Sequence, residues 1–284
     1  MSYKTIVVHC DQSRHAAARY ALAARVALAA GAHLTGVALT GISRYAEWND
    51  SLGAWPLPPH VLDHLRHQAG AALATFERDV AAAGVDQWSS SLYEDDAESG
   101  LLQHARYADL LVLGQTDPDD IQFGISRPLP PELLLQGGRP LLLAPNTGNP
   151  AGDTPASGAF RHPLLAWDGS NQAARAFTDA LPLLKLAERI TLLVLNADQD
   201  KARHGSEPGA DMALFLARHG VRVDVMREFT TLETGAALLG AAAERGCDLL
   251  VMGGYGHRRL HETLLGGATR GVLRGMTLPV LISH

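Results

Sequence analysis

The segment with the clearest chemical potential is rich in glycine and lies near the end of the chain. Gly253 and Gly256 open it, and Gly266 and Gly267 close it just before Thr269. Glycine lets a ligand approach the backbone closely, because no Cβ is in the way. Main-chain N–H groups at the start of a helix attract anions, and the helix dipole adds to that attraction. The pattern favours a phosphate-binding loop, with the threonine hydroxyl available to a phosphate or its metal, although such glycines also form tight turns.

Two regular elements must position this loop. The apolar run at 248–252 predicts a buried strand, and residues 267–275 predict a helix. Open parallel sheets bind ligands at the carboxyl ends of their strands, which is where the loop begins. The same alternation runs through the second half, which predicts strands at 163–167, 190–196, 221–228, 248–252 and 279–283 and helices at 171–187, 207–219, 233–245 and 267–275.

The chain repeats itself. Ala108–Gly114 resembles Cys247–Gly253 at an offset of 139 residues, and a later apolar run repeats at the same offset. The opening strands match as well, with Asp11 corresponding to Asp168 at an offset of 157 residues. The repeat predicts an α/β fold of two doubly wound five-stranded parallel-sheet domains in tandem, each with strand order 3-2-1-4-5.

The expected domains are unequal in length. The first covers 1–146, the second covers 160–284, and the linker at 147–159 consists largely of turn-forming residues. The first half has about 18 more residues between its matched aspartates than the second half. We assign this excess to an inserted loop within Gly41–Leu65.

These features together resemble the universal stress protein family. The resemblance rests on the spacing glycine, two residues, glycine, nine residues, glycine from Gly253 to Gly266, on the opening strand that ends in Asp168, and on the closing strand near 279–282. It covers both halves, so the chain is similar to a tandem universal stress protein. The resemblance implies a sheet of five parallel strands that binds ATP in some members.

The resemblance also implies contacts in the second half. Ala166 and Asp168 match positions that flank the adenosine, and Val194 matches an adenine contact. The phosphate loop is matched at its start by Met252, Gly253 and Gly256 and at its end by Gly266, Gly267, Ala268 and Thr269. Gly267 stands where nucleotide-binding members have Ser or Thr. One hydrogen bond to a charged group is worth about 1.5–3 kcal/mol, so we expect weakened affinity, with Thr269 as the residue that can compensate.

The first half departs from this pattern. At the offset of 139, the loop residues become Asp117 for Gly256, Arg127 for Gly266, Pro128 for Gly267 and Pro130 for Thr269. Asp117, Asp119 and Asp120 would repel phosphate, and the two prolines remove two N–H donors. We therefore expect nucleotide only in the second domain.

The last strand of each repeat, 141–144 and 280–283, lies at a sheet edge in the expected order. An uncovered apolar edge is a liability, so we expect the two edges to pair within the chain. The family resemblance implies that such edges can pair between separate chains, which leaves a homodimer as a second arrangement.

Other candidate residues have alternative interpretations. Asp168 either positions a ribose or a metal, or caps the following helix, and His257–Arg259 either meets phosphate or is solvated. Three histidines at helical spacing are interpreted as exposed helix surface and not as metal ligands: His60, His64 and His67. Two cysteines are interpreted as small core residues: Cys10 and Cys247.

Composition narrows the function classes. The 284 residues are 46% hydrophobic and 19% charged with a net charge of −6, and no apolar run is long enough for a membrane span. No basic patch supports nucleic-acid binding. We expect a cytoplasmic protein with neither a membrane nor a nucleic-acid partner.

Two functions remain open at this point. The first is a nucleotide-binding stress-response protein that holds ATP, with Mg²⁺, in the second domain and has a sensing or regulatory role. The second is a scaffold or interaction module without a nucleotide. The sequence places no catalytic residue and no resident metal site, so at most slow ATP hydrolysis is expected.

Overall fold

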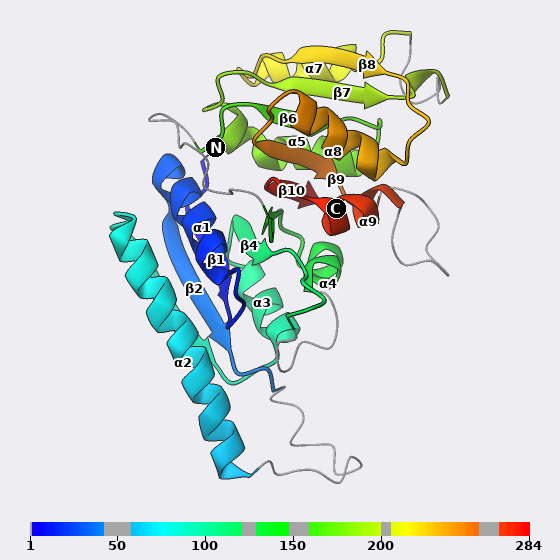
Figure 1. Ribbon diagram of the computed structural model, residues 1–284. Coiled ribbons are helices and arrows are strands. Elements are labelled where there is room, and N and C mark those ends of the chain that lie inside the picture. Colours follow the sequence, from blue (N-terminus) through cyan, green and yellow to red (C-terminus); the bar gives the residue numbers. More distant parts are fainter. Residues whose placement is uncertain (1, 43–57, 121–128, 148–158, 200–205, 256–266) are drawn as a thin grey trace. The chain divides into compact units, whose positions relative to one another are not determined.

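The computed structural model describes residues 2–42, 58–120, 129–147, 159–199, 206–255 and 267–284 (Figure 1). Contacts divide the chain into two compact units, of which the first is Tyr3–Arg139 and the second contains Pro140–His284. The predicted linker at 147–159 lies mostly outside the described residues. The domain bounds drawn from the sequence repeat remain a prediction.

The first unit alternates strands and helices. Its strands pair in parallel, β1 with both β2 and β4, and β2 with β3. The first five strands of the chain have the order 3-2-1-4-5, as predicted. The elements of this unit are β1 (Thr5–Cys10), α1 (Ala16–Ala30), β2 (His33–Leu39), α2 (Pro59–Ala82), β3 (Trp88–Tyr93), α3 (Ala97–Ala105), β4 (Leu110–Gly114) and α4 (Leu129–Gln136).

The second unit repeats this topology. Strand β6 pairs in parallel with β7 and β9, while β7 pairs with β8 and β9 with β10. Figure 1 shows α8 and α9 in front of this sheet and α5 and α7 behind it, so both faces are covered. The elements are β5 (Leu141–Ala144), β6 (Pro163–Ala166), α5 (Asn171–Leu184), β7 (Thr191–Leu195), the short 3₁₀ helix η3 (Ala197–Gln199), α7 (Ala210–Arg218), β8 (Asp224–Glu228), α8 (Thr234–Glu244), β9 (Leu249–Gly253), α9 (Gly267–Gly275) and β10 (Val280–Ser283).

Strand β5 is the one antiparallel element described in the second unit. It pairs with β10, with Leu142 opposite Leu281. The two edges that were predicted to pair within the chain therefore do so. Although β5 closes the first sequence repeat, its contacts place it with the second unit.

The repeated aspartate before β4 and β9 has a structural role. The Asp109 carboxylate accepts hydrogen bonds from the main-chain N–H groups of Lys4 and Thr5, at 2.7 and 3.0 Å. Asp248 accepts the equivalent bonds from residues 161 and 162, at 2.6 and 2.9 Å. Each aspartate thus fixes the start of the neighbouring first strand, which explains why it occurs in both repeats.

The prediction of an inserted loop within Gly41–Leu65 is partly wrong. Residues 43–57 lie outside the described residues, but α2 begins at Pro59, so the last part of the predicted loop is helical. Proline suits the first helical position, because its fixed φ is compatible with the helix and no donor is lost there. Helix α2 has 24 residues, whereas its counterpart α7 has 9, so part of the extra length of the first half lies in this helix.

Four further predictions concern the histidines of α2, the two cysteines, the start of β8 and membrane-spanning helices. The three histidines of α2 are exposed, as interpreted: His60, His64 and His67. Cys10 is buried and Cys247 half-buried, and burial raises the pKa of these thiols to about 12 and about 11. Strand β8 begins at Asp224, three residues later than predicted. No helix among the described residues is both long and apolar enough to cross a membrane.

Candidate functional site

Three predicted contact residues meet at the carboxyl edge of the second sheet. Ala166, the last residue of β6, lies opposite Met252 of β9 on one side and opposite Leu193 of β7 on the other. Val194 follows directly in β7 and is buried, as is Met252. Residues from three separate strands are therefore brought side by side at the edge where open α/β sheets bind ligands.

The turn from β6 into α5 settles one alternative for Asp168. Its Oδ1 accepts a hydrogen bond from the Ser170 N–H at 3.0 Å, which closes the turn. The helix cap is Ser170, whose hydroxyl accepts from the Ala173 N–H at 3.1 Å. Asp168 therefore shapes the turn without capping α5, and its side chain is exposed beside the strand ends.

Gly253 is required by packing. A Cβ at this position would lie 2.4 Å from the main-chain nitrogen of Ala173, at the start of α5. Its counterpart Gly114 is similarly restricted, since a Cβ there would lie 2.8 Å from Nη1 of Arg19. Gly253 thus permits close approach of a helix to the sheet, and Gly114 leaves room for the buried Arg19 side chain, in both cases independently of any ligand.

At the far end of the glycine-rich segment, packing does not require a glycine. Gly267 begins α9, and a Cβ added there would meet no atom within 4 Å. Ala268 is part-buried and Thr269 buried, and the Thr269 hydroxyl accepts a bond of 3.4 Å from the Tyr255 N–H. Tyr255 itself has a left-handed backbone, with φ of 56°. The predicted loop residues Gly256 and Gly266 lie outside the described residues.

An open groove of about 410 Å³ lies between α5 and α7. Trp167 lines it together with Met212 and Phe215, while Arg175 and Asp211 provide charged groups. Trp167 stands in the chain between Ala166 and Asp168, so the groove lies next to the strand ends described above. The sequence interpretation did not identify it, because its residues come from two helices that are far apart in sequence.

The first half carries a buried ionic cluster that the sequence interpretation also missed. Asp11 accepts a hydrogen bond of 2.5 Å from Nη2 of Arg19, and it lies 3.3 Å from Nδ1 of His9. His9 and Arg19 are 4% and 3% exposed. Burial lowers the pKa of His9 to about 4. Burial alone raises the pKa of Asp11, but Arg19 and His9 outweigh it and hold this pKa at about 2.

A cavity of about 50 Å³ adjoins this cluster at the ends of β1 and β2. Its polar lining includes His9, Asp11, Thr40 and Gln68. A space of this size suits a few water molecules better than a nucleotide. One sequence signal pointed to the cluster: Arg19 interrupts an otherwise apolar helix face, where the aligned residue of the second half is an alanine.

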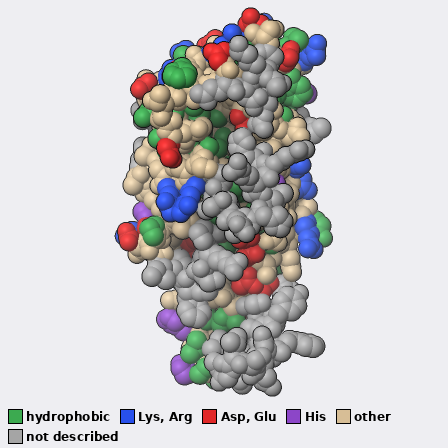
Figure 2. Space-filling model, turned by 90° about the vertical axis from the view of Figure 1, so that its right-hand side faces the viewer, with side chains coloured by type: hydrophobic (Ala, Val, Ile, Leu, Met, Phe, Trp, Pro, Cys, Tyr) green, Lys and Arg blue, Asp and Glu red, His purple; other side chains and the backbone are tan. Residues whose placement is uncertain are grey.

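Charges on the visible surface are mixed. On the face shown in Figure 2, Lys and Arg side chains are interspersed with Asp and Glu, and the described residues of that face form no broad basic patch. Among the described residues, several surface charges are paired, as in Arg189 with Asp224 and Arg227 with Glu207.

Comparison with family models decides the identity of the second half. Residues 159–284 match the model of the universal stress protein family. The second half of the chain belongs to the universal stress protein family. The universal stress protein domain thus contains every predicted contact residue, from Ala166 to Thr269.

Solved structures extend the likeness to the full length. A universal stress protein from Archaeoglobus fulgidus is 17% identical and covers 98% of this chain and 95% of its own, with a TM-score of 0.69. A putative universal stress protein from Pseudomonas aeruginosa is 16% identical, with coverage of 99% and 93% and a TM-score of 0.58. The fold of both halves is therefore that of a tandem universal stress protein. No curated protein matches the sequence.

Proposed function

We propose that the chain binds ATP or a related nucleotide in its universal stress protein domain and acts as a cytoplasmic sensor or regulator. The observation that carries the proposal is the meeting of Ala166, Val194 and Met252 at the carboxyl ends of three adjacent strands. The groove beginning at Trp167 offers an apolar surface beside them, within the size range of small-molecule sites.

The start of α9 supports an anionic ligand at the other end of the site. Gly267 is exposed and has open space where a side chain would be, so a phosphate can approach its N–H group. Thr269 accepts a bond from Tyr255 and can still donate its own hydroxyl hydrogen. Mg²⁺ would enter with ATP, and we propose no turnover beyond slow hydrolysis.

A scaffold that binds no nucleotide is the second candidate, and a specific observation favours it. Gly253 is explained by its contact with α5, and the Thr269 hydroxyl by its bond to Tyr255. Two of the residues that suggested a phosphate loop thus have structural roles without a ligand. Gly267 is not explained in this way.

Titration calorimetry with ATP and Mg²⁺ separates the two candidates. We expect the wild-type protein to bind and Gly256→Asp to abolish binding, because a carboxylate added to the glycine-rich segment would repel the phosphates. Gly240→Asp is the matched control, since this exposed position on α8 has no atom within 4 Å of an added Cβ. Undiminished binding by Gly256→Asp would place the ligand elsewhere, and no binding by the wild-type protein would favour the scaffold.

A further inference from the structure

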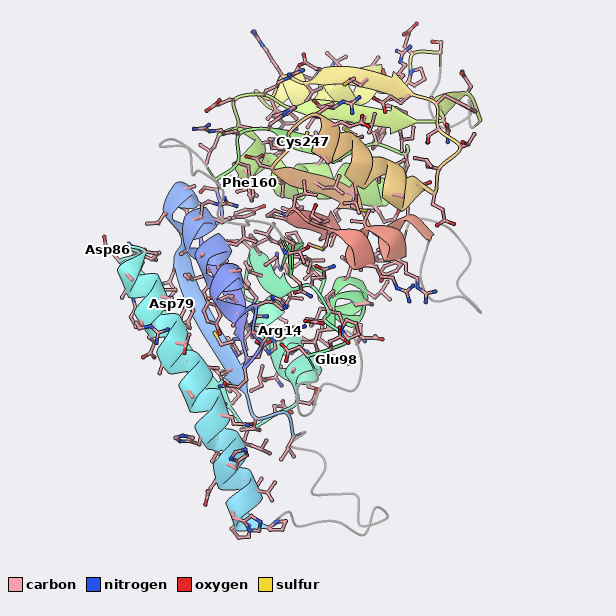
Figure 3. The ribbon with its side chains drawn as sticks, in the orientation of Figure 1. Arg14, Asp79, Asp86, Glu98, Phe160 and Cys247 are labelled. Carbon is pink, nitrogen blue, oxygen red and sulfur yellow. The ribbon has the colours of Figure 1, made fainter. Side chains whose placement is uncertain are left out.

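In the first half, the Asp117 carboxylate links the loop after β4 to the turn after β1 through side-chain hydrogen bonds. Asp117 Oδ2 accepts hydrogen bonds from Arg14, at 2.5 Å from Nη2 and 3.1 Å from Nε. The same oxygen lies 3.0 Å from Nε2 of His15. Arg14 is labelled in Figure 3, where β1 passes into α1. Arg14 Nε also donates a hydrogen bond to His15 Nε2, at 3.2 Å. Residues more than 100 positions apart in the chain thus form an Arg–Asp ion pair with the imidazole of His15 beside it.

Further bonds hold this loop in place. The second Asp117 oxygen accepts from the Asp119 N–H at 3.0 Å, and Asp120 accepts from the Arg14 N–H at 3.1 Å. The Asp117 side chain is only 11% exposed. Hydrogen bonding from Arg14 is the main cause that lowers the pKa of Asp117 to about 2, so the carboxylate is ionised at any ordinary pH.

The second half has different residue types at the matching positions. Arg14 and His15 align with the neutral Asn171 and Gln172, and Asp117 aligns with Gly256. The arginine, the histidine and the carboxylate that both contact therefore occur at these positions only in the first half. A guanidinium group binds carboxylate and phosphate oxygens through the same pair of donors, so the place that Asp117 fills has the chemistry of an oxyanion site.

We propose that Asp117 is an internal plug: its carboxylate occupies the oxyanion position between Arg14 and His15 and closes the first half to phosphate. The sequence alone presents Asp117 as a source of repulsion. The structure assigns it a positive role, because it satisfies the Arg14 guanidinium, which would otherwise attract an anion from solution. The proposal goes beyond the nucleotide site of the second half and holds whether or not that site binds ATP.

The test is to remove the plug and offer inorganic phosphate. Asp117→Ala leaves Arg14 and His15 without their partner, and the imidazole NMR signals of His15 report binding at this place alone. We assign those signals by their loss in His15→Gln. The matched control is Asp119→Ala, which removes an exposed acid of the same loop. If Asp117→Ala does not fold, Asp117→Ser is used, since its hydroxyl can still accept from the Asp119 N–H.

We expect phosphate to shift the His15 signals saturably in the Asp117 variant and to leave them unchanged in the wild-type protein and in Asp119→Ala. Adding Arg14→Gln to the Asp117 variant should weaken this binding about tenfold or more, because a charged hydrogen-bond donor is lost. A folded Asp117 variant without a response would overturn the proposal. An equal response in the wild-type protein or in Asp119→Ala would do the same. Because the readout is local to His15, these results are separate from ATP binding by the second half.

Discussion

Replacing Arg19 by methionine tests the buried cluster of the first half. Arg19 is 3% exposed and holds the Asp11 carboxylate at 2.5 Å. Methionine retains much of the apolar stem but removes the charge, so Asp11 is left buried without its cation. The second half has Ala176 at the aligned position and therefore needs no such partner.

The size of the effect follows from the pKa of Asp11. This pKa is lowered from 3.8 to about 2, which at 1.36 kcal/mol per unit corresponds to roughly 2.4 kcal/mol of stability at neutral pH. Breaking a buried ion pair from one side typically costs about 3–5 kcal/mol, because an uncompensated charge remains. We expect Arg19→Met to lower the free energy of unfolding by about 3 kcal/mol at pH 7.

The pH dependence has a definite sign. In the wild-type protein the Asp11 contribution is fully present above pH 3.8 and is lost as the pH falls through about 2. Without Arg19, burial still raises the pKa of Asp11 while the main group that lowers it is gone, so this pKa moves upward and protonation of Asp11 costs the folded variant less. Loss of Arg19 also removes one of the causes that lower the pKa of His9, which acts in the same direction. The stability gap between wild type and variant should therefore narrow as the pH is lowered from 7 to 4.

Urea unfolding followed by circular dichroism at pH 7 and pH 4 measures this gap. Arg106→Met is the control, because Arg106 is exposed and directly follows the end of α3. The double variant Asp11→Asn with Arg19→Met removes both charges and should recover much of the loss. A cost below about 1 kcal/mol at pH 7, or a gap that does not change with pH, would refute the reasoning.

Two further predictions concern backbone contacts and use the same urea assay. Gly253→Ala should destabilise the protein, because the added Cβ would lie 2.4 Å from a main-chain nitrogen, whereas Gly240→Ala on α8 should stabilise it by about 0.4–1 kcal/mol; equal effects at the two sites would contradict the packing role of Gly253. Asp248→Ala removes two hydrogen bonds to the start of β6 and should cost about 2–3 kcal/mol. A change of less than about 0.5 kcal/mol, typical of surface sites, would show that Asp248 is dispensable there.

Much of the fold could be predicted because the chain contains two versions of one pattern. The run ending at Gly114 aligned with the run ending at Gly253, which located β4 and β9 without knowledge of any contact. Helix α9 was predicted with its observed bounds, since both ends are marked by glycine. The predicted end of the inserted loop was wrong, because Pro59 is compatible with both a loop and the first turn of a helix.

The sites were harder to predict because they depend on contacts across the chain. Asp117 was interpreted as repelling phosphate, since its neighbours in sequence are also acidic. Its bond to Arg14 spans 103 positions and becomes visible only once β1 and β4 lie side by side. The roles of Gly253 and Thr269 were ambiguous for a similar reason: the atoms that restrict them belong to other segments.

The pairing of β5 with β10 affects how the protein can be made and divided. Leu142 pairs opposite Leu281, which is synthesised 139 residues later, so during translation the edge of β5 that pairs with β10 stays uncovered until the last strand is complete. A fragment that begins at the sequence linker would lack β5 and expose the edge of β10 to aggregation. A recombinant second half should therefore start at Pro140, where the compact unit begins, and not at the boundary drawn from the repeat.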